Sequence, residues 1–310
     1  NAETTTNAQA MACADVVNFI SFAAMNWLFV AKRKIHPALI LNIDATQYQT
    51  GINGTKAVKV KSIGPITGPV KALPGKGDNS NGLVYFVKYF LLMNAAGDIL
   101  EPVYVVADAT MNDDEFHSNE IPGLGVGTDP DAPGWLVFCK TQCANIASFK
   151  WLNTEIIAKS VEKLREVYGL DKEEAWFQLD GEPIQIKCYD LPEIADMYEK
   201  LFIAIGKPPA STTSTTQPCD IGNCFKGSKK TIKFINDCNI DPEMHKALMT
   251  TVKLAIERHC SLIISRNNNA KPMPGTHKHD CLYGLLRVRQ AIMQSVKRST
   301  VQDSFKLAGI

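Results

Sequence analysis

The stretch "PALILNIDATQ" (residues 37–47) holds the first clear β-strand of the chain. Residues 38–43 are apolar except for Asn42, and Asp44 follows directly. Charged side chains are rarely buried, so an apolar run that ends in an aspartate is unusual. The pattern predicts a buried strand that ends at Asp44 and presents its carboxylate at one edge of a sheet.

More strands follow along the chain. The run "NGLVYFVKYFLLMNAAGDILEPVYVVADA" (81–109) predicts a hairpin of two long antiparallel strands, with Gly97 and Asp98 in the turn. The run "EAWFQLDGE" (174–182) predicts a short strand that ends at Asp180, and "LFIAIGK" (201–207) predicts another. Between them, the Asp-, Gly- and Pro-rich residues 108–134 are interpreted as a surface excursion whose acids, Asp113, Asp114 and Glu115, are solvated.

Helices are expected between and after these strands. Asn153 is interpreted as the N-cap of a helix that continues to Tyr168 and stops at Gly169. Residues 191–201 predict a second helix, and a third begins at Pro218 with Asp220 in its first turn. Periodic apolar residues near 242–264 and 282–297 make the C-terminal third mostly helical. The order strand, hairpin, helix, strand, helix, strand, helix indicates an α/β fold with a mixed sheet.

The composition is that of a globular protein. The chain has 310 residues, of which 45% are hydrophobic, and no run of eighteen uncharged apolar residues, so no membrane span is expected. Nine cysteines are scattered singly, which fits a reducing intracellular compartment and favours core cysteines over zinc ligands. The chain opens at Asn1 with a polar, Thr-rich stretch, so we expect it to be an excerpt from a longer protein.

Charge is divided unevenly along the sequence. The net charge is +1, but residues 221–310 hold 15 basic and 6 acidic residues, while residues 1–220 hold 18 basic and 26 acidic ones. This asymmetry suits a protein that gathers cations at one site and phosphates at another, although solvated helix faces also produce such a pattern.

Three carboxylates are candidates for one site. Asp44 and Asp180 each end an apolar strand, and Asp220 opens the helix after the next strand, so all three could reach one edge of the sheet. Carboxylates held together repel one another unless cations neutralise them, and an oxygen-only set suits Mg²⁺ or Mn²⁺. Local chemistry alone also allows Asp220 to be an ordinary helix-terminus residue, because acids are favoured in a first turn.

The segment "PPASTTSTTQPCDIGNCFK" (208–226) resembles a motif of the DDE/DDD endonuclease domain of mariner and pogo-like transposases. "LNIDATQ" and "LDGE" resemble the first- and second-aspartate strands of that family, and "VQDSFKLAGI" (301–310) resembles its closing motif. The sequence departs from the family at Ala45, where an acid is common, and at Gly181 and Glu182, where a His-containing pair is common. The missing His puts fine positioning in doubt but removes no metal ligand.

The resemblance implies a ribonuclease H-like mixed sheet flanked by helices, with a helical C-terminal extension. Residues 1–34 are then a helical lead-in that ends an upstream region, residues 35–236 the catalytic domain, and residues 237–310 a helical, basic C-terminal region. Helix-turn-helix modules usually precede such a domain, and the roughly 35 residues before the first strand are too few for one module plus a linker.

The implied function is a metal-dependent DNA endonuclease and strand transferase that nicks transposon ends and joins the freed 3′-hydroxyl to target DNA. Two Mg²⁺ or Mn²⁺ ions about 3.5 to 4 Å apart are expected, with Asp44 bridging both and Asp180 and Asp220 each completing one shell. The resemblance also implies DNA as the partner, a nuclear location and no membrane association, and it is compatible with a homodimer or a higher assembly on DNA.

Basic residues near Asp220 are candidate phosphate contacts. Four lysines recur at i, i+3, i+4 and i+7, which places them in one stripe on the predicted helix. A solvated helix face explains such a stripe equally well. The loop after residue 264 carries a weaker version of the same pattern. The candidates are Lys226, Lys229, Lys230 and Lys233 in the stripe, and Arg266, Lys271, His277, Lys278 and His279 in the loop.

Two other functions stay open. A host-adopted, catalytically inactive DNA-binding or chromatin protein would keep the fold without cleavage; the three intact acids argue against it and the missing His argues mildly for it. A ribonuclease H-like nuclease without strand transfer is the other, and the "QPCD" context (217–220) favours the transposase over it.

Overall fold

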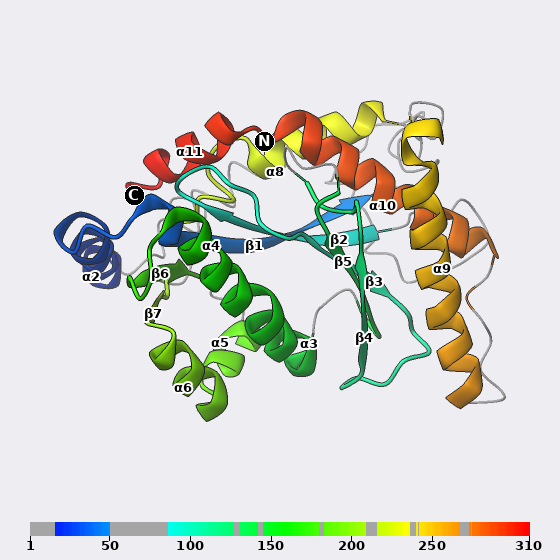
Figure 1. Ribbon diagram of the computed structural model, residues 1–310, viewed down its shortest axis with the longest axis horizontal. Coiled ribbons are helices and arrows are strands. Elements are labelled where there is room, and N and C mark those ends of the chain that lie inside the picture. Colours follow the sequence, from blue (N-terminus) through cyan, green and yellow to red (C-terminus); the bar gives the residue numbers. More distant parts are fainter. Residues whose placement is uncertain are drawn as a thin grey trace, which may run out of the picture.

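A mixed sheet forms the centre of the molecule (Figure 1). The computed structural model describes residues 16–49, 86–126, 131–141, 145–179, 183–208, 216–235, 240, 242–266, 273 and 275–310. Within these residues the sheet has seven strands in the order β4-β5-β3-β2-β1-β6-β7. They are β1 (Ile40–Gln49), β2 (Phe86–Asn94), β3 (Val103–Ala107), β4 (Phe116–Ile121), β5 (Gly134–Cys139), β6 (Ala175–Gln178) and β7 (Ile203–Gly206).

Five of these strands have the connectivity of a ribonuclease H-like sheet. β1, β2 and β3 pair antiparallel as a meander, whereas β6 adds to the other side of β1 in parallel and β7 adds to β6 in parallel. Successive parallel strands need a crossover connection, which helices provide here. The predicted mixed α/β fold is therefore confirmed, and so is the hairpin turn, where Gly97 adopts φ +97°.

The interpretation of residues 108–134 as a surface excursion was wrong. This segment contains β4, and β5 begins at its end; β5 pairs parallel with β3, and β4 pairs antiparallel with β5 at the edge of the sheet. The residues of β4, "FHSNEI", are mostly polar and only partly buried, so they carry no hydrophobic alternation. Polar edge strands protect sheets from pairing with other chains, and this is why the sequence pattern did not reveal β4.

One face of the sheet is covered by helices from the middle of the chain (Figure 1). The first begins after Asn145, whose side chain accepts a hydrogen bond from the backbone N–H of Ser148 in a capping box. The predicted cap, Asn153, instead lies buried inside the continuing helix; the predicted stop at Gly169 is confirmed, with φ 65°. The elements are α3 (Ile146–Trp151), η3 (Leu152–Ala158), α4 (Lys159–Tyr168), α5 (Pro183–Tyr189) and α6 (Pro192–Lys200).

The opposite face is covered by C-terminal helices. α10 packs against α8 and β2, and α9 lies against the edge strand β4 (Figure 1). α11 is tied to the β2–β3 hairpin, because Arg298 and Gln302 both donate hydrogen bonds to the carbonyl of Ala96. The elements are α8 (Cys224–Thr231), η4 (Ile232–Phe234), α9 (Pro242–Arg266), α10 (Gly275–Ser295) and α11 (Arg298–Leu307).

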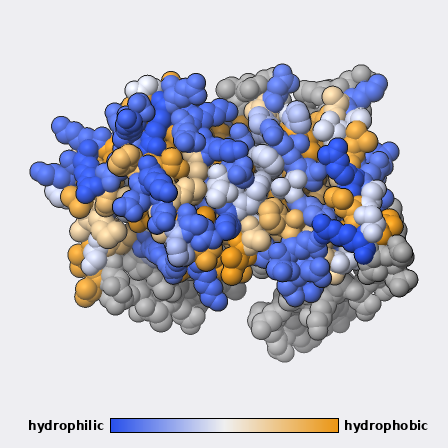
Figure 2. All heavy atoms as spheres, turned by 60° about the horizontal axis from the view of Figure 1, so that its bottom comes forward, coloured by the Kyte–Doolittle hydropathy of each residue, from blue (hydrophilic) through white to orange (hydrophobic). Residues whose placement is uncertain are grey.

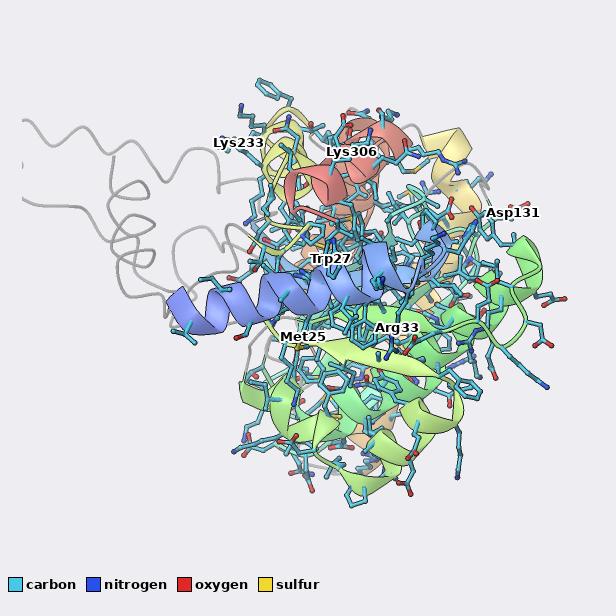
Figure 3. All side chains as sticks on the ribbon, turned by 90° about the vertical axis from the view of Figure 1, so that its left-hand side faces the viewer. Met25, Trp27, Arg33, Asp131, Lys233 and Lys306 are labelled. Carbon is cyan, nitrogen blue, oxygen red and sulfur yellow. The ribbon has the colours of Figure 1, made fainter. Side chains whose placement is uncertain are left out.

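A helix before the sheet runs along its β6–β7 side. It consists of α2 (Val16–Asn26) and the π-helical segment η1 (Trp27–Lys32), and a short 3₁₀ turn, η2 (Pro37–Leu39), leads into β1. Figure 3 shows this helix crossing the molecule. Phe29 stacks on Trp176 of β6 with ring centroids 4.5 Å apart, and Arg33 pairs with Glu174.

Hydrophilic side chains cover most of the α3–α6 side of the molecule, with smaller apolar patches between them (Figure 2). Among the described helices, none is both long and apolar enough to cross a membrane.

Candidate functional site at the β1–β6 junction

Asp44 does not end its strand as predicted. β1 continues to Gln49 because β2 pairs with it along its whole length, but β6 pairs only with Ile40 to Asn42. Among the described residues, the last pair between β1 and β6 joins Asn42 to Gln178, and Asp44 lies two residues further along β1. The residue is 6% exposed, and its Oδ1 accepts a hydrogen bond from the N–H of Ala45 at 2.6 Å.

The face of β1 that carries Asp44 points toward the segment 216–228. Side chains two residues apart on a strand share a face, so Asn42, Asp44 and Tyr48 lie on the same side of β1. The hydroxyl of Tyr48 contacts Ser228 of α8 at 2.5 Å. At the other end of this row, the Asn42 side chain accepts a hydrogen bond from the backbone N–H of Cys219 at 3.0 Å. Asp44 thus lies between two contacts to the segment that contains Asp220.

Three buried amide side chains bind this segment to the ends of β1 and β6. Asn42 donates to the carbonyl of Gln178 at 3.1 Å, and Gln178 donates to the carbonyl of Thr216 at 2.6 Å. Gln217 donates to the carbonyl of Leu179 at 2.8 Å. All three amide residues are fully buried. Buried polar groups need such partners, so this network fixes the position of residues 216–219 relative to the two strands.

Asp220 lies in a turn and not in the first turn of a helix. Its backbone N–H and that of Ile221 both donate to the carbonyl of Gln217, and α8 begins only at Cys224, with no acidic residue in its first turn. Gly222 makes the bend into α8 with φ +74°, and a Cβ at this position would lie 2.7 Å from Ser304 Oγ. The simple helix-terminus explanation for Asp220 is therefore wrong, and its side chain is exposed.

Asp44 and Asp220 make the surroundings of Cys219 negative. Burial raises the pKa of the Cys219 thiol well above its usual range, and the charges of Asp44 and Asp220 raise it further. The Cys219 Sγ lies 3.6 Å from the carbonyl of Leu91, the residue that pairs with Asp44 across the sheet. Asp44 and Asp220 thus both lie near enough to Cys219 for their charges to act on its thiol.

Asp180 lies outside the described residues, as do Gly181 and Glu182. Among the residues that the structure describes, no three His, Cys, Asp or Glu side chains form a metal-ligand group. The register of the described β1–β6 pairs can still be compared with the numbers of the two candidate aspartates. Ile40 pairs with Trp176 and Asn42 with Gln178, so the register offset is 136 residues, which is also the difference between the numbers 44 and 180.

The lysine stripe is exposed but is not on one continuous helix. Lys226, Lys229 and Lys230 lie on α8 with exposed side chains, whereas Lys233 lies in the 3₁₀ turn η4, because α8 ends at Thr231. Figure 3 shows Lys233 at the outer surface of the molecule.

The basic residues predicted in the loop are dispersed by the fold. Arg266 is the last residue of α9 and forms an ion pair with Glu115. Lys271 lies outside the described residues. His277, Lys278 and His279 belong to the first turns of α10 and not to a loop.

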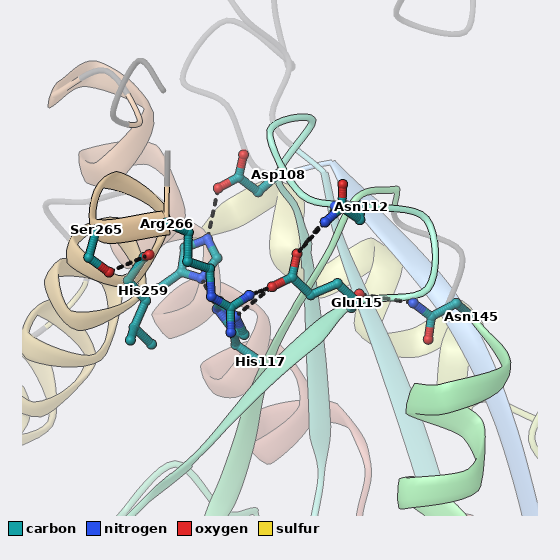
Figure 4. Close-up of polar contacts among 9 residues, drawn as sticks. Asp108, Asn112, Glu115, His117, Asn145, His259, Ser265 and Arg266 are labelled. Atoms are coloured by element: carbon teal, nitrogen blue, oxygen red, sulfur yellow. Dashed lines mark hydrogen bonds and ion pairs between the residues drawn. The ribbon is translucent and has the colours of Figure 1, made fainter. Parts of the chain in front are cut away.

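A second polar cluster, which the sequence interpretation missed, connects α9 to the sheet edge (Figure 4). His259 of α9 is completely buried, and its ring stacks on Phe138 with centroids 3.8 Å apart. Its Nε2 lies 2.7 Å from Asp108 Oδ2, and its Nδ1 lies 2.9 Å from Nδ1 of His117 on β4. Glu115, two residues before His117 in the sequence, also belongs to the cluster. Its Oε1 lies 3.3 Å from Nε2 of His117.

Only one proton fits between the two Nδ1 atoms, because one nitrogen must donate while the other accepts. Burial lowers the pKa of His117, and the neighbouring His259 lowers it further. Burial opposes ionisation of Asp108, but hydrogen bonds from His259 and Thr110 outweigh it and lower the pKa of Asp108 to about 2. The cluster is therefore an ionised, hydrogen-bonded link between α9 and the sheet.

Two of the amide residues that the sequence interpretation missed, Asn42 and Gln178, do have a recognisable sequence pattern. Asn42 interrupts an apolar strand two residues before Asp44, and Gln178 interrupts another two residues before Asp180. A polar side chain on the same strand face as a candidate ligand indicates a positioning role, because both point to one side of the sheet. The cluster of His117 and His259 had no comparable signal, since 142 residues separate them.

Comparisons with known proteins give a limited result. No protein-family model matches the chain, and no curated protein matches it either. Among solved structures, it is similar to a pre-cleavage Mos1 transpososome, at 11% identity and a TM-score of 0.39, over 90% of this chain and 62% of that one. It is also similar to a Mos1 transposase paired-end complex with the left transposon end, at 12% identity and a TM-score of 0.39, over 93% and 61% of the two chains. The chain thus spans less than two thirds of the length of those transposase chains.

Proposed function

We propose that this chain is the catalytic domain of a metal-dependent DNA endonuclease and strand transferase of the mariner and pogo-like DDE/DDD type. The observation that carries the proposal is the hydrogen-bonded network of Asn42, Gln178 and Gln217. It brings the segment of Asp220 to the strand that carries Asp44. The sequence motif "QPCD" and the ribonuclease H-like order of the strands support the same function.

The residues fit Mg²⁺ or Mn²⁺, because Asp44 and Asp220 offer carboxylate oxygens beside the same buried thiol. Asp180 is proposed as the third ligand, which the register offset of 136 residues between β1 and β6 supports. When bound, one or two such ions would supply positive charge that activates water and stabilises the charge developing on phosphate.

The chain itself contributes binding and position. The buried amides hold the carboxylate-bearing segments together, and the reaction needs no covalent protein nucleophile, since in-line displacement at phosphorus uses water or a DNA hydroxyl. The exposed lysines of α8 and η4 begin six residues beyond Asp220, and we expect them to bind phosphates near it. DNA is accordingly the proposed partner, and the nucleus the proposed location.

The test is the variant Asp220→Asn in a nicking assay on supercoiled plasmid with Mg²⁺ or Mn²⁺. Because the change keeps the shape and removes a charge that only a cation needs, we expect nicking to fall by more than about 100-fold. DNA binding and the unfolding midpoint should stay close to wild type, since Asp220 is exposed and outside the helix. Equal nicking by variant and wild type would refute the proposal, and DNA binding without nicking in the wild type would support the inactive, host-adopted alternative.

The lysines need a separate test. Changing Lys226, Lys229, Lys230 and Lys233 together to Ala should reduce the slope of log affinity against log salt, because fewer counterions are released on binding. All four side chains are exposed, so the fold should not change. An unchanged slope would show that these lysines only solvate the surface.

A further inference from the structure

A cleft lies between α9 and α10, and neither Asp44 nor Asp220 lines it. Its volume is about 690 Å³, within the roughly 300 to 1,000 Å³ that small-ligand sites occupy. The two helices pack against each other on the right-hand side of Figure 1. The cleft is lined by Lys246, Met249 and Lys253 of α9 and by Lys278, Leu282 and Tyr283 of α10, among others.

The lining combines an apolar floor with cations. Met249, Leu282 and Tyr283 are partly buried and pack against the core, so their remaining surface forms the floor. Lys246 and Lys253 are exposed on one face of α9, seven residues apart, which is about 10 Å along a helix. Glu257 is the acid among the described lining residues, against three lysines. The cleft is therefore positive along its length and apolar at its base.

This arrangement selects among anionic ligands. A fatty acid has one charge at one end and would use one lysine, whereas lysines about 10 Å apart fit a ligand with separated charges. An aromatic ring at the base, with His279 tilted beside Tyr283 at 4.4 Å between centroids, fits flat rings that stack. Separated phosphates joined to flat bases are the chemistry of a nucleic acid strand, and binding sites for single strands combine these same two features.

The geometry points to a binding site for about two nucleotides of single-stranded DNA in this cleft, with bases on Tyr283 and Leu282 and phosphates on Lys246, Lys253 and Lys278. This inference rests on the proposed function, because it takes DNA as the strand. α10 links the cleft to the first site: Ser295 packs beside Gly227 of α8, twelve residues, or about 18 Å, along the helix from Tyr283. This length of α10 corresponds to about five nucleotides at about 3.4 Å per nucleotide of one strand.

The test uses the whole chain and a short single-stranded oligodeoxynucleotide that carries 2-aminopurine, whose fluorescence falls when the base stacks. We expect quenching on binding by wild type and by Tyr283→Phe, which keeps the ring. Tyr283→Leu keeps the apolar floor without the ring and should bind at least about fivefold more weakly. Equal affinity and quenching for the Phe and Leu variants would overturn the proposal.

A second part of the test changes exposed lysines, whose replacement does not disturb the packing of the core. Lys253→Gln should lower the slope of log affinity against log salt by about 0.7, the value for one contact to a single strand. Lys163→Gln, at an exposed lysine on α4, is the matched control and should leave the slope unchanged. Equal slopes for the two variants would overturn the proposal, and so would a free nucleotide that competes as well as the oligonucleotide.

The two proposals fail in different ways. If Asp220→Asn abolishes nicking while Tyr283→Leu binds the oligonucleotide like wild type, the cleft proposal is wrong and the catalytic one stands. If Tyr283→Leu loses binding while Asp220→Asn nicks like wild type, the catalytic assignment is wrong and the cleft is a strand-binding site of another kind of protein.

Discussion

Among the described residues, the polar network at the β1–β6 junction and the one at the sheet edge differ in chemistry. At the β1–β6 junction, Asn42, Gln178 and Gln217 are neutral amides that bond to backbone groups. At the sheet edge, His117, His259 and Asp108 form a link that depends on protons. Neutral amides keep their hydrogen bonds at any moderate pH, whereas a shared proton makes the second network sensitive to it.

The difference indicates separate roles. The amide network fixes the segment before Asp220 against β1, and the proposed cation site would benefit from supports that do not titrate. The histidine network attaches α9 to an edge strand, so its loss would affect that helix before the sheet core. The following predictions test whether the amide network positions the segment of Asp220 and the histidine network stabilises the attachment of α9.

The largest expected effect is on stability at the sheet edge. His259→Ala removes a stacked ring and leaves the Asp108 carboxylate without its main partner, so unfolding in urea should show a loss of about 3 kcal/mol. His259→Phe keeps the ring stack and should recover only part of this loss. Nicking per folded molecule should stay close to wild type for both variants; a selective loss of nicking would show that the two networks are coupled.

Asn42→Ala should have the next largest effect on stability and a specific effect on activity. It leaves the N–H of Cys219 and the carbonyl of Gln178 without their partner, at a cost of about 2 kcal/mol. Displacement of Asp220 should also lower nicking by at least about tenfold.

The matched control is Asn94→Ala, a buried amide on β2 that bonds to Ala38 and Asp98 instead. It should lose similar stability and keep its nicking rate. If both variants lose nicking equally, the effect of Asn42 is only one of stability.

The pH dependence of stability should come partly from His117. Its pKa in the folded protein is lowered from 6.5, so below pH 6.5 the unfolded chain binds more protons than the folded one, and stability falls as pH falls through that range. One group contributes at most about 1.4 kcal/mol per pH unit. Urea unfolding at several pH values should therefore show a shallower acid loss for His117→Gln than for wild type.

His279→Gln is the control for this measurement, because His279 is exposed and outside the cluster. His277, whose pKa is also lowered by burial, should keep part of the acid sensitivity in every variant. An unchanged pH profile in His117→Gln would contradict the assignment of the shared proton to the His117–His259 contact.

The smallest expected effect is that of Tyr48→Phe, which removes one buried hydrogen bond between β1 and α8. Ser228 keeps its bonds to the carbonyls of Cys224 and Phe225, so the cost should be about 1 kcal/mol in urea unfolding. A loss above that of Asn42→Ala would show that α8, and not the amide network, holds the site together.

Much of the fold was predictable from local patterns. The apolar strands around Asp44, Trp176 and Ile203 and the turn at Gly97 carried clear signals, because buried strands are continuous apolar runs and tight turns need glycine. The edge strand β4 had no such signal. Its residues are mostly polar and only partly buried, as an edge strand allows, so they form no apolar run. The start of α8 was misplaced because Pro218 and Asp220 form a turn that mimics a helix start.

The sequence by itself indicated the mixed α/β class, the candidate carboxylates and the division of charge, because each follows from residue types and local patterns along the chain. Only the tertiary structure showed that Asn42 and Cys219, 177 residues apart, join the strand of Asp44 to the turn of Asp220, and that His117 meets His259. Contacts of this kind depend on how elements pack. A buried amide or imidazole reveals its role only when the partner that satisfies it has been brought beside it by the fold.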